Sequence, residues 1–166
     1  MRHEGDARDF IESNYARLTQ LAVAVAGNQH DGADLLHDTL EKLYRRWSRT
    51  TVDNPWGLAK TIMVRTSIDR YRRRRHEVLT SDWLDVPGEP LLHITGENDE
   101  LLKALSSIPL KQRAAVALRF LEDMSYPDIA GVMGISEVGV RTNVTRGTAA
   151  IRARLAASEI ERTEST

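Results

Sequence analysis

The chain has 166 residues, 41% of them hydrophobic, which suits one globular domain or two small ones. It has no cysteine, which excludes disulfides and thiolate metal sites and fits a reducing cytoplasm, and no apolar run approaches the length needed to span a membrane. The net charge of −1 conceals segregated signs: residues 42–75 hold eleven Lys/Arg and two acids, residues 76–100 hold seven acids and no Lys/Arg, and residues 101–155 hold eight Lys/Arg and four acids. This pattern indicates two anion-binding modules around an acidic connector.

The first 75 residues predict three helices. Apolar residues recur at the helical period over residues 8–26, and the pair Gly27-Asn28 ends that helix. A second amphipathic helix runs from Asp31 to about Trp47, and a third starts at Asn54-Pro55 and runs to about Arg75. The inward stripes are expected to be Ile11, Tyr15, Leu18, Ala22 and Val25 in the first helix, Leu36, Leu40, Leu43 and Trp47 in the second, and Ala59, Ile62, Met63 and Thr66 in the third.

Aromatic side chains interrupt the basic block of residues 42–75. Trp47, Trp56 and Tyr71 lie among its arginines, which end in the run Arg72–Arg75. Basic residues among aromatics can follow a phosphate backbone and stack on unpaired bases. Each aromatic taken singly is more typical of a core, and the arginine run suits a solvated helix end.

Residues 76–96 break every periodicity. Pro87, Gly88, Pro90 and Gly96 predict a linker between domains, although its scattered apolar side chains should dock on a neighbour.

The C-terminal part predicts four more helices. Residues 97–107 place Leu101, Leu105 and then Ile108 inward, and residues 110–122 place Ala114, Ala117, Leu118 and Leu121 on one side. A helix, a glycine turn and a second helix follow: Ser125 can cap the first helix with Pro127 in its opening turn, Gly134 suits a left-handed turn, and Ser136 can cap the second. Beyond residue 158 the polar tail is expected to fray.

The last predicted helix has two distinct faces. Val140, Val144, Ile151 and Leu155 form an inward stripe. The opposite side combines charge, hydroxyls and one small apolar group, which are the side chains that reach phosphates, base edges and thymine methyls in a major groove; this set is Glu137, Val138, Arg141, Thr142, Thr145 and Arg146. The pattern favours a DNA-binding helix-turn-helix over an ordinary solvated hairpin.

Signatures of an enzyme are missing from the sequence. The five histidines are scattered, and His37 beside Asp34 and Asp38 lacks a further metal ligand. Gly131-Val132-Met133-Gly134 is a turn and not a phosphate loop. We therefore expect no catalytic residue, no metal and no cofactor.

The chain over residues 8–155 resembles the extracytoplasmic-function group of bacterial sigma factors. Ile108-Pro109-Leu110-Lys111-Gln112-Arg113, Ser125-Tyr126-Pro127-Asp128-Ile129-Ala130 and Val140-Arg141-Thr142 are similar to region four of that family. Asp31-Gly32-Ala33-Asp34-Leu35-Leu36-His37-Asp38 resembles the polymerase-binding helix of region two, and Pro55-Trp56-Gly57-Leu58 with Asp69-Arg70-Tyr71-Arg72-Arg73 resembles its promoter-melting part.

The resemblance implies an all-α, non-enzymatic, cytoplasmic protein of two small helical domains. Residues 1–75 would be region two, 76–96 an acidic linker, 97–158 a region-four helix-turn-helix, and 159–166 a polar tail. Core RNA polymerase (β′ clamp helices and β flap), promoter DNA and an anti-sigma factor would be the partners, without membrane insertion.

The resemblance also implies a role for each group of residues. The minus-thirty-five element would be read by Glu137, Val138, Arg141, Thr142, Thr145 and Arg146. The minus-ten element would be bound and melted by Arg49, Thr50, Asp53, Asn54, Trp56, Lys60, Arg65 and Arg70. Core polymerase would be bound by Asp31, Asp34, Leu35, Asp38 and Thr39.

The sequence departs from the family at three positions and leaves two alternatives open. His37 stands where glutamine is common, and Asn143 stands where a basic residue is usual. Gly147 should cost up to about 1 kcal/mol of helix stability and soften the helix beyond Arg146. The alternatives are a stand-alone helix-turn-helix regulator and a sigma-like interaction protein that barely binds DNA.

Overall fold

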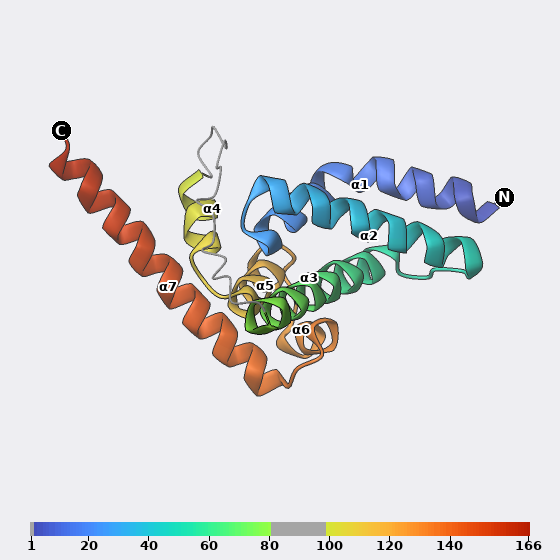
Figure 1. Ribbon diagram of the computed structural model, residues 1–166. Coiled ribbons are helices and arrows are strands. Elements are labelled where there is room, and N and C mark those ends of the chain that lie inside the picture. Colours follow the sequence, from blue (N-terminus) through green and yellow to red (C-terminus); the bar gives the residue numbers. More distant parts are fainter. Residues whose placement is uncertain (1, 81–98) are drawn as a thin grey trace.

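The computed structural model describes residues 2–80 and 99–166, and every regular element in these ranges is a helix (Figure 1). The N-terminal half consists of α1 (Arg2–Ala26), α2 (Gln29–Arg49) and α3 (Pro55–Thr80). The C-terminal half consists of α4 (Asp99–Ser106), α5 (Leu110–Phe120), α6 (Tyr126–Met133) and α7 (Glu137–Glu164). The all-helical prediction is confirmed, and none of the described helices is long and apolar enough to cross a bilayer. Residues 81–96 of the expected linker lie outside the described residues.

Asparagine side chains set the starts of α2 and α3. The Asn28 carbonyl oxygen accepts the Asp31 backbone N–H at 2.8 Å, and its amide donates to the Asp31 carboxylate at 2.9 Å. The predicted start at Asp31 is therefore wrong by two residues, because Asn28 is the cap and Asp31 lies in the first turn. In the same way Asn54 accepts the Gly57 backbone N–H at 2.9 Å and caps α3.

The predicted helix-turn-helix is present with its caps. Ser125 Oγ accepts the Asp128 N–H at 3.2 Å, and Ser136 Oγ accepts the Gly139 N–H at 3.0 Å. Gly134 between them has a φ of 66°, in the left-handed region where a side chain is strained. Ser125 thus starts α6, whereas Gly134 and Ser136 turn the chain between α6 and α7, which lie side by side at the lower end of the view in Figure 1.

Two helices are longer than predicted. α3 continues five residues beyond Arg75, through Thr80. α7 continues through Glu164, so the prediction that the tail frays from residue 159 is wrong. α4 packs against α7, and the Arg162 guanidinium lies 2.6 Å from the Glu100 carboxylate of α4. This long-range contact joins the polar tail to α4.

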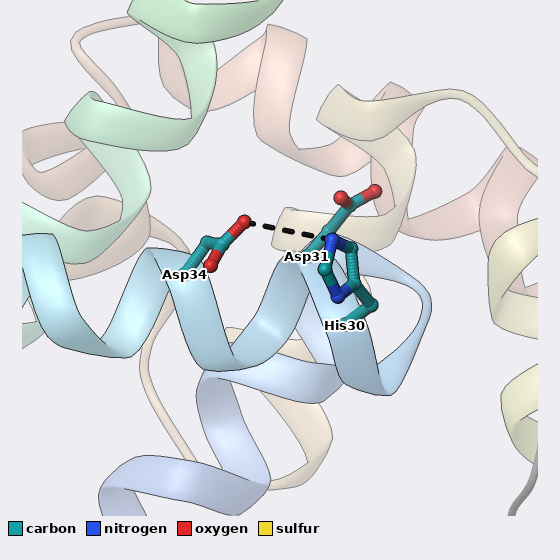
Figure 2. A group of neighbouring side chains, drawn as sticks. All are labelled: His30, Asp31 and Asp34. Carbon is teal, nitrogen blue, oxygen red and sulfur yellow. Dashed lines mark ion pairs between the residues drawn. The ribbon is translucent and has the colours of Figure 1, made fainter.

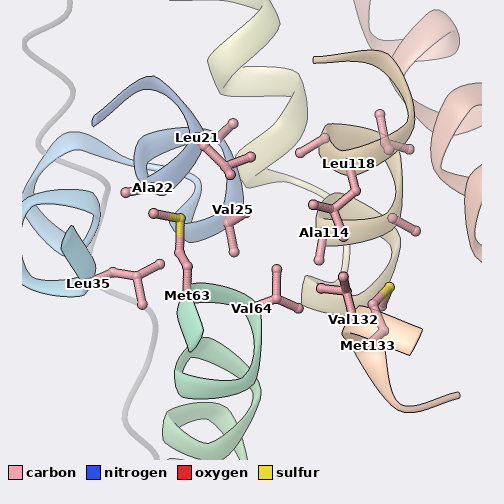
Figure 3. Close-up of a cluster of buried hydrophobic side chains, with 14 of the residues drawn as sticks. Leu21, Ala22, Val25, Leu35, Met63, Val64, Ala114, Leu118, Val132 and Met133 are labelled. Atoms are coloured by element: carbon pink, nitrogen blue, oxygen red, sulfur yellow. The ribbon is translucent and has the colours of Figure 1, made fainter. Parts of the chain in front are cut away.

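The two halves share one hydrophobic core (Figure 3). Leu21 and Val25 of α1 and Val64 of α3 face Ala114 and Leu118 of α5, and all five are at most 1% exposed. Within residues 2–80 and 99–166, the buried apolar side chains of the two helical domains therefore form one continuous cluster. The apolar side chains at this join leave water only when the halves pack together, and that burial stabilises the arrangement.

The residues of the predicted stripes are buried or partly buried, with three exposed exceptions. Tyr15 is 53% exposed, and Leu101 and Leu121 are each 41% exposed. In α4, which packs against α7, Leu105 is buried as predicted, but Leu102 is buried in place of its neighbour Leu101. A helix of 8 residues has too few turns for the sequence to fix its rotation.

Gly147 has a packing role that the sequence did not reveal. A Cβ at this position would lie 2.8 Å from Val116 Cγ2 and 3.3 Å from the Gln112 backbone oxygen, both on α5. The absence of a side chain therefore lets α5 and α7 approach closely. α7 runs without interruption through Gly147.

Candidate nucleic-acid interface

The outward face of α7 is open to solvent, as predicted. Val138 is 73% exposed, whereas the inward Val140 and Val144 are 0% and 5% exposed. The other residues of the predicted reading face are exposed as well: Glu137, Arg141, Thr142, Thr145 and Arg146. The helix thus presents two arginines, two threonines and a valine on one side, at the spacing that a major groove can accept.

Tyr126, which the sequence analysis did not assign, orients Arg141. The Arg141 guanidinium lies 4.7 Å from the centre of the Tyr126 ring and 3.4 Å from the Glu137 carboxylate. Arg119 lies 4.9 Å from the same ring and donates to the Met124 carbonyl at 2.8 Å. Cation–π contact on an exposed surface restricts the arginine before any ligand arrives. The signal in the sequence is an aromatic residue at the start of α6, directly after its cap.

Asn143, the departure from the family pattern, does not face outward. Its amide donates to the Gly139 carbonyl of its own helix at 2.8 Å, and the side chain is half-buried. One N–H of this amide is therefore held against its own helix.

The residues predicted for the minus-ten element fall into three groups that differ in their surroundings. The first group is exposed to solvent. Arg49, Thr50 and Asp53 are exposed around the end of α2. Next to them is an open hollow of about 370 Å³ whose lining is almost entirely basic: Lys42, Arg45, Arg46, Arg49 and Thr50. Such a surface can follow a phosphate backbone.

The second group is structural. Asn54 is occupied as the cap of α3. Arg70 forms an ion pair with Asp38 and lies 3.5 Å from the Asp34 carbonyl, which joins α3 to α2.

The third group faces the C-terminal half of the chain. The Trp56 indole N–H donates to the Glu122 carboxylate at 2.7 Å, and Lys60 Nζ lies 3.9 Å from the same oxygen. Arg17 donates to Glu122 at 2.8 Å and lies 4.0 Å from the centre of the Trp56 ring. Arg65 donates to the carbonyls of Gly131 and Val132 at the end of α6, at 3.1 and 3.3 Å. Arg17 and Glu122 were missed, since nothing local in the sequence brings residues so far apart together.

The residues predicted to bind polymerase from α2 also differ in their surroundings: one is exposed, two are engaged by other side chains and two are buried. The Asp34 side chain is 63% exposed, Asp31 is engaged by Asn28, and Asp38 is engaged by Arg70. Leu35 and Thr39 are 1% and 0% exposed, and the Thr39 hydroxyl donates to the Leu35 carbonyl at 2.7 Å. The assignment of these two residues to a docking surface is therefore corrected: both side chains belong to the core and are not accessible to a partner in this structure.

His30 lies beside two of these acids. Its ring Nε2 is 3.9 Å from the Asp34 carboxylate, and ligand atoms of His30, Asp31 and Asp34 lie within 4.8 Å of one another (Figure 2). A histidine and an aspartate one turn apart on an exposed helix form this pair without an ion. The group gives α2 a polar, outward edge at its N-terminal end.

Comparison with known families assigns both halves of the chain. Residues 10–77 match sigma-70 region 2, and residues 98–151 match sigma-70, region 4.

Individual relatives agree with this assignment. The chain is 30% identical over 165 residues to the ECF RNA polymerase sigma factor SigE of Mycolicibacterium smegmatis, covering 95% of this chain and 64% of that protein. It is 27% identical to the RNA polymerase sigma-E factor of Streptomyces coelicolor, covering 92% of this chain and 88% of the relative. The chain thus spans slightly less than two thirds of the first relative and most of the second.

A solved structure shares the fold. The sigma factor RpoE, in complex with the anti-sigma factor NepR from Bartonella quintana, superposes with a TM-score of 0.71 at 22% sequence identity. The match covers 91% of this chain and 97% of that one.

Proposed function

Because the chain belongs to the extracytoplasmic-function group of sigma-70 factors, we propose that it directs RNA polymerase to specific promoters and aids their melting at transcription initiation. The observation that carries the proposal is the pair of DNA-competent surfaces in the family's order. A basic surface with aromatics lies in the N-terminal half, and an exposed helix-turn-helix face lies in the C-terminal half.

Each surface has a separate task. The α7 face reads the minus-thirty-five element, with Arg141 and Arg146 on base edges or phosphates and Val138 near a thymine methyl. The basic surface from Arg49 through α3 binds the minus-ten strand, and Trp56 stacks on an unpaired base. Residues 1–75 and 97–158 are the two functional modules, joined by residues 76–96.

Core RNA polymerase is the principal protein partner. Asp34, the exposed acid of the predicted set on α2, faces the β′ clamp helices, and the C-terminal half meets the β flap. An anti-sigma factor is a second partner, since the RpoE structure holds one. A subunit of the polymerase acts in the cytoplasm, and it needs no catalytic residue of its own.

Run-off transcription tests the proposal. Purified protein is added to core RNA polymerase with a pool of genomic promoter fragments, and discrete transcripts that depend on the protein are expected. A binding measurement with core polymerase, without DNA, accompanies it.

The two rival functions give different results in this experiment. A stand-alone regulator would fail to associate with polymerase and would bind a palindromic operator tightly by itself, and that result would overturn the proposal. A sigma-like interaction protein would associate with polymerase without selecting any promoter. The exposed Arg141 and Arg146 favour promoter selection over this second rival.

A further inference from the structure

A small hollow lies where the two halves of the chain meet. Residues of α1, α2 and α3 from the N-terminal half and of α5 from the C-terminal half form its wall. Its volume is about 80 Å³. At about 30 Å³ for each water molecule, this is room for roughly two or three waters or for one tetrahedral oxyanion. The hollow is therefore of the right size for a small ion and too small for a larger organic ligand to enter whole.

α3 supplies most of the polar groups in this wall. The contributing residues are Ser67, Arg70, Tyr71 and Arg74. Their spacings of three, one and three residues place them on one face of the helix. That face combines two guanidinium groups with two hydroxyl groups, and each of these groups can donate a hydrogen bond to an anion. Within the described part of the chain, the Ser67 hydroxyl has no hydrogen-bond partner.

Arg113 of α5 adds a third guanidinium group from the other half of the chain. Its Nε donates to the Val25 carbonyl at 2.6 Å, and its Nη1 donates to the Ile108 carbonyl at 3.1 Å. Among residues 2–80 and 99–166, no group accepts a hydrogen bond from Nη2, and no carboxylate forms an ion pair with this guanidinium. Arg113 therefore lines the hollow with N–H donors to spare.

The charges around the hollow are positive on balance. Asp31 supplies a carboxylate in the wall, and Asp38 is paired with Arg70. Arg74 is exposed and forms no ion pair with a described residue. Three guanidinium groups thus stand against two carboxylates. α5 begins at Leu110, which is also in the wall, and no side chain caps its first turn, so the helix dipole adds to the positive potential.

We propose that this hollow binds a phosphate group, held between α3 and α5 by Arg74, Arg113 and the Ser67 hydroxyl. A planar guanidinium donates two parallel hydrogen bonds to a phosphate, and its charge strengthens them. The phosphate comes from the free ion or from the end of a nucleotide, because the hollow opens to solvent beside Arg74 and Tyr71, the latter 51% exposed. The site is complete in the free chain and does not rest on the proposed function.

Isothermal titration calorimetry of the full-length free protein tests the site. Sodium phosphate and adenosine 5′-monophosphate are titrated separately at neutral pH, with the ionic strength held constant by sodium chloride. We expect saturable binding of one phosphate per chain. Tighter binding of the nucleotide than of phosphate would identify a nucleotide as the source of the bound group, whereas equal or weaker binding would assign the site to the free ion.

Arg74→Gln removes one guanidinium from the wall without breaking an ion pair between described residues. We expect its affinity for phosphate to fall about tenfold, because a charge-assisted pair of hydrogen bonds is lost. Arg74→Lys keeps the charge without the planar fork and should bind with intermediate affinity. The matched control is Arg72→Gln, which removes the same charge from an exposed residue on the opposite side of α3 and should bind within about twofold of wild type.

Thermal unfolding gives an independent measurement. A ligand that binds only the folded chain raises its Tm, so phosphate should raise the Tm of wild type and of Arg72→Gln more than that of Arg74→Gln. Absence of saturable binding by wild type, or equal phosphate affinity in Arg74→Gln and Arg72→Gln, would overturn the site. Neither measurement involves polymerase or promoter DNA, so loss of the phosphate site leaves the proposed function standing, and a negative run-off experiment leaves the site standing.

Discussion

Arg113 joins the ends of two helices from different halves of the molecule. Its guanidinium donates to the Val25 carbonyl near the end of α1 at 2.6 Å and to the Ile108 carbonyl after α4 at 3.1 Å. A weaker contact reaches Leu105 at 3.5 Å. Burial lowers the pKa of Arg113 to about 10, while the nearby Asp31 opposes that shift. The folded state therefore releases this proton more readily than the unfolded one, so the burial penalty is fully present below about pH 10 and is relieved as the pH rises above that value.

Arg113→Met should destabilise the protein. Methionine fills a similar length of the site but leaves buried carbonyls without a donor, and this loss outweighs the relieved burial of the charge. We expect the free energy of unfolding to fall by about 2–3 kcal/mol. Urea denaturation followed by circular dichroism measures it, and Lys111→Met, an exposed residue on the same helix, serves as the control with little change.

Arg141 and Arg146 are the two exposed arginines of the α7 reading face. Arg141→Ala with Arg146→Ala should reduce promoter-specific transcription at least tenfold, because each lost base contact removes about 1–3 kcal/mol of discrimination. The matched control is Arg152→Ala with Arg154→Ala, two exposed arginines further along α7 and outside the reading face. Run-off transcription measures both, and equal losses in the two double variants would contradict the assignment of the reading face.

At the scale of helices, Gly147 sets how closely α5 and α7 can cross. Gly147→Ala would raise the helix propensity of α7 by about 1 kcal/mol, yet the new methyl group meets Val116 at 2.8 Å and a backbone oxygen at 3.3 Å. A β-branched, buried valine on a packed helix cannot move aside at low cost. We expect a net destabilisation of about 1–2 kcal/mol from overpacking.

Gly131→Ala is the matched control for that prediction. Gly131 lies on α6, is exposed, and has nothing within 4 Å of the position of a Cβ. The same substitution should therefore stabilise the protein, by up to about 1 kcal/mol. Thermal unfolding of the two variants gives shifts of opposite sign, and a stabilising effect of Gly147→Ala would show that the crossing is not close-packed.

For the whole molecule, the proposed function divides the work between surfaces on different halves. Asp34→Arg reverses the charge of an exposed side chain on α2 and leaves the structural Asp38–Arg70 pair intact. We expect core polymerase to bind about tenfold more weakly, since charge complementarity at the docking surface is lost. Glu12→Arg is the control, because its side chain is 62% exposed, close to the 63% of Asp34, and lies on another helix.

The DNA-reading pair should behave in the opposite way. Arg141→Ala with Arg146→Ala is expected to leave polymerase binding unchanged while promoter selection is lost. Fluorescence anisotropy with labelled protein measures the affinity for core polymerase in each variant. Weakening of polymerase binding by both Asp34→Arg and the arginine pair would refute the division of labour.

The sequence by itself determined the local structure and the faces of the amphipathic helices. Ser125, Gly134 and Ser136 set their turns through bonds within a few residues, and the stripe of Val140 and Val144 fixed which side of α7 faces water. These features depend on side chains close together in the chain, so their spacing is sufficient to predict them.

Only the tertiary structure decided which predicted site residues are available. Leu35 and Thr39 are buried, Asn54 and Arg70 hold helices in place, and Trp56 with Lys60 is occupied by Glu122, 66 positions along the chain from Trp56. Each outcome follows from packing between helices distant in sequence, and one helix's hydrophobic pattern does not specify its partner. Gly147 is missed for the same reason. Its low helix propensity predicts a weak point in α7, whereas the close crossing of α5 and α7 requires a residue without a side chain.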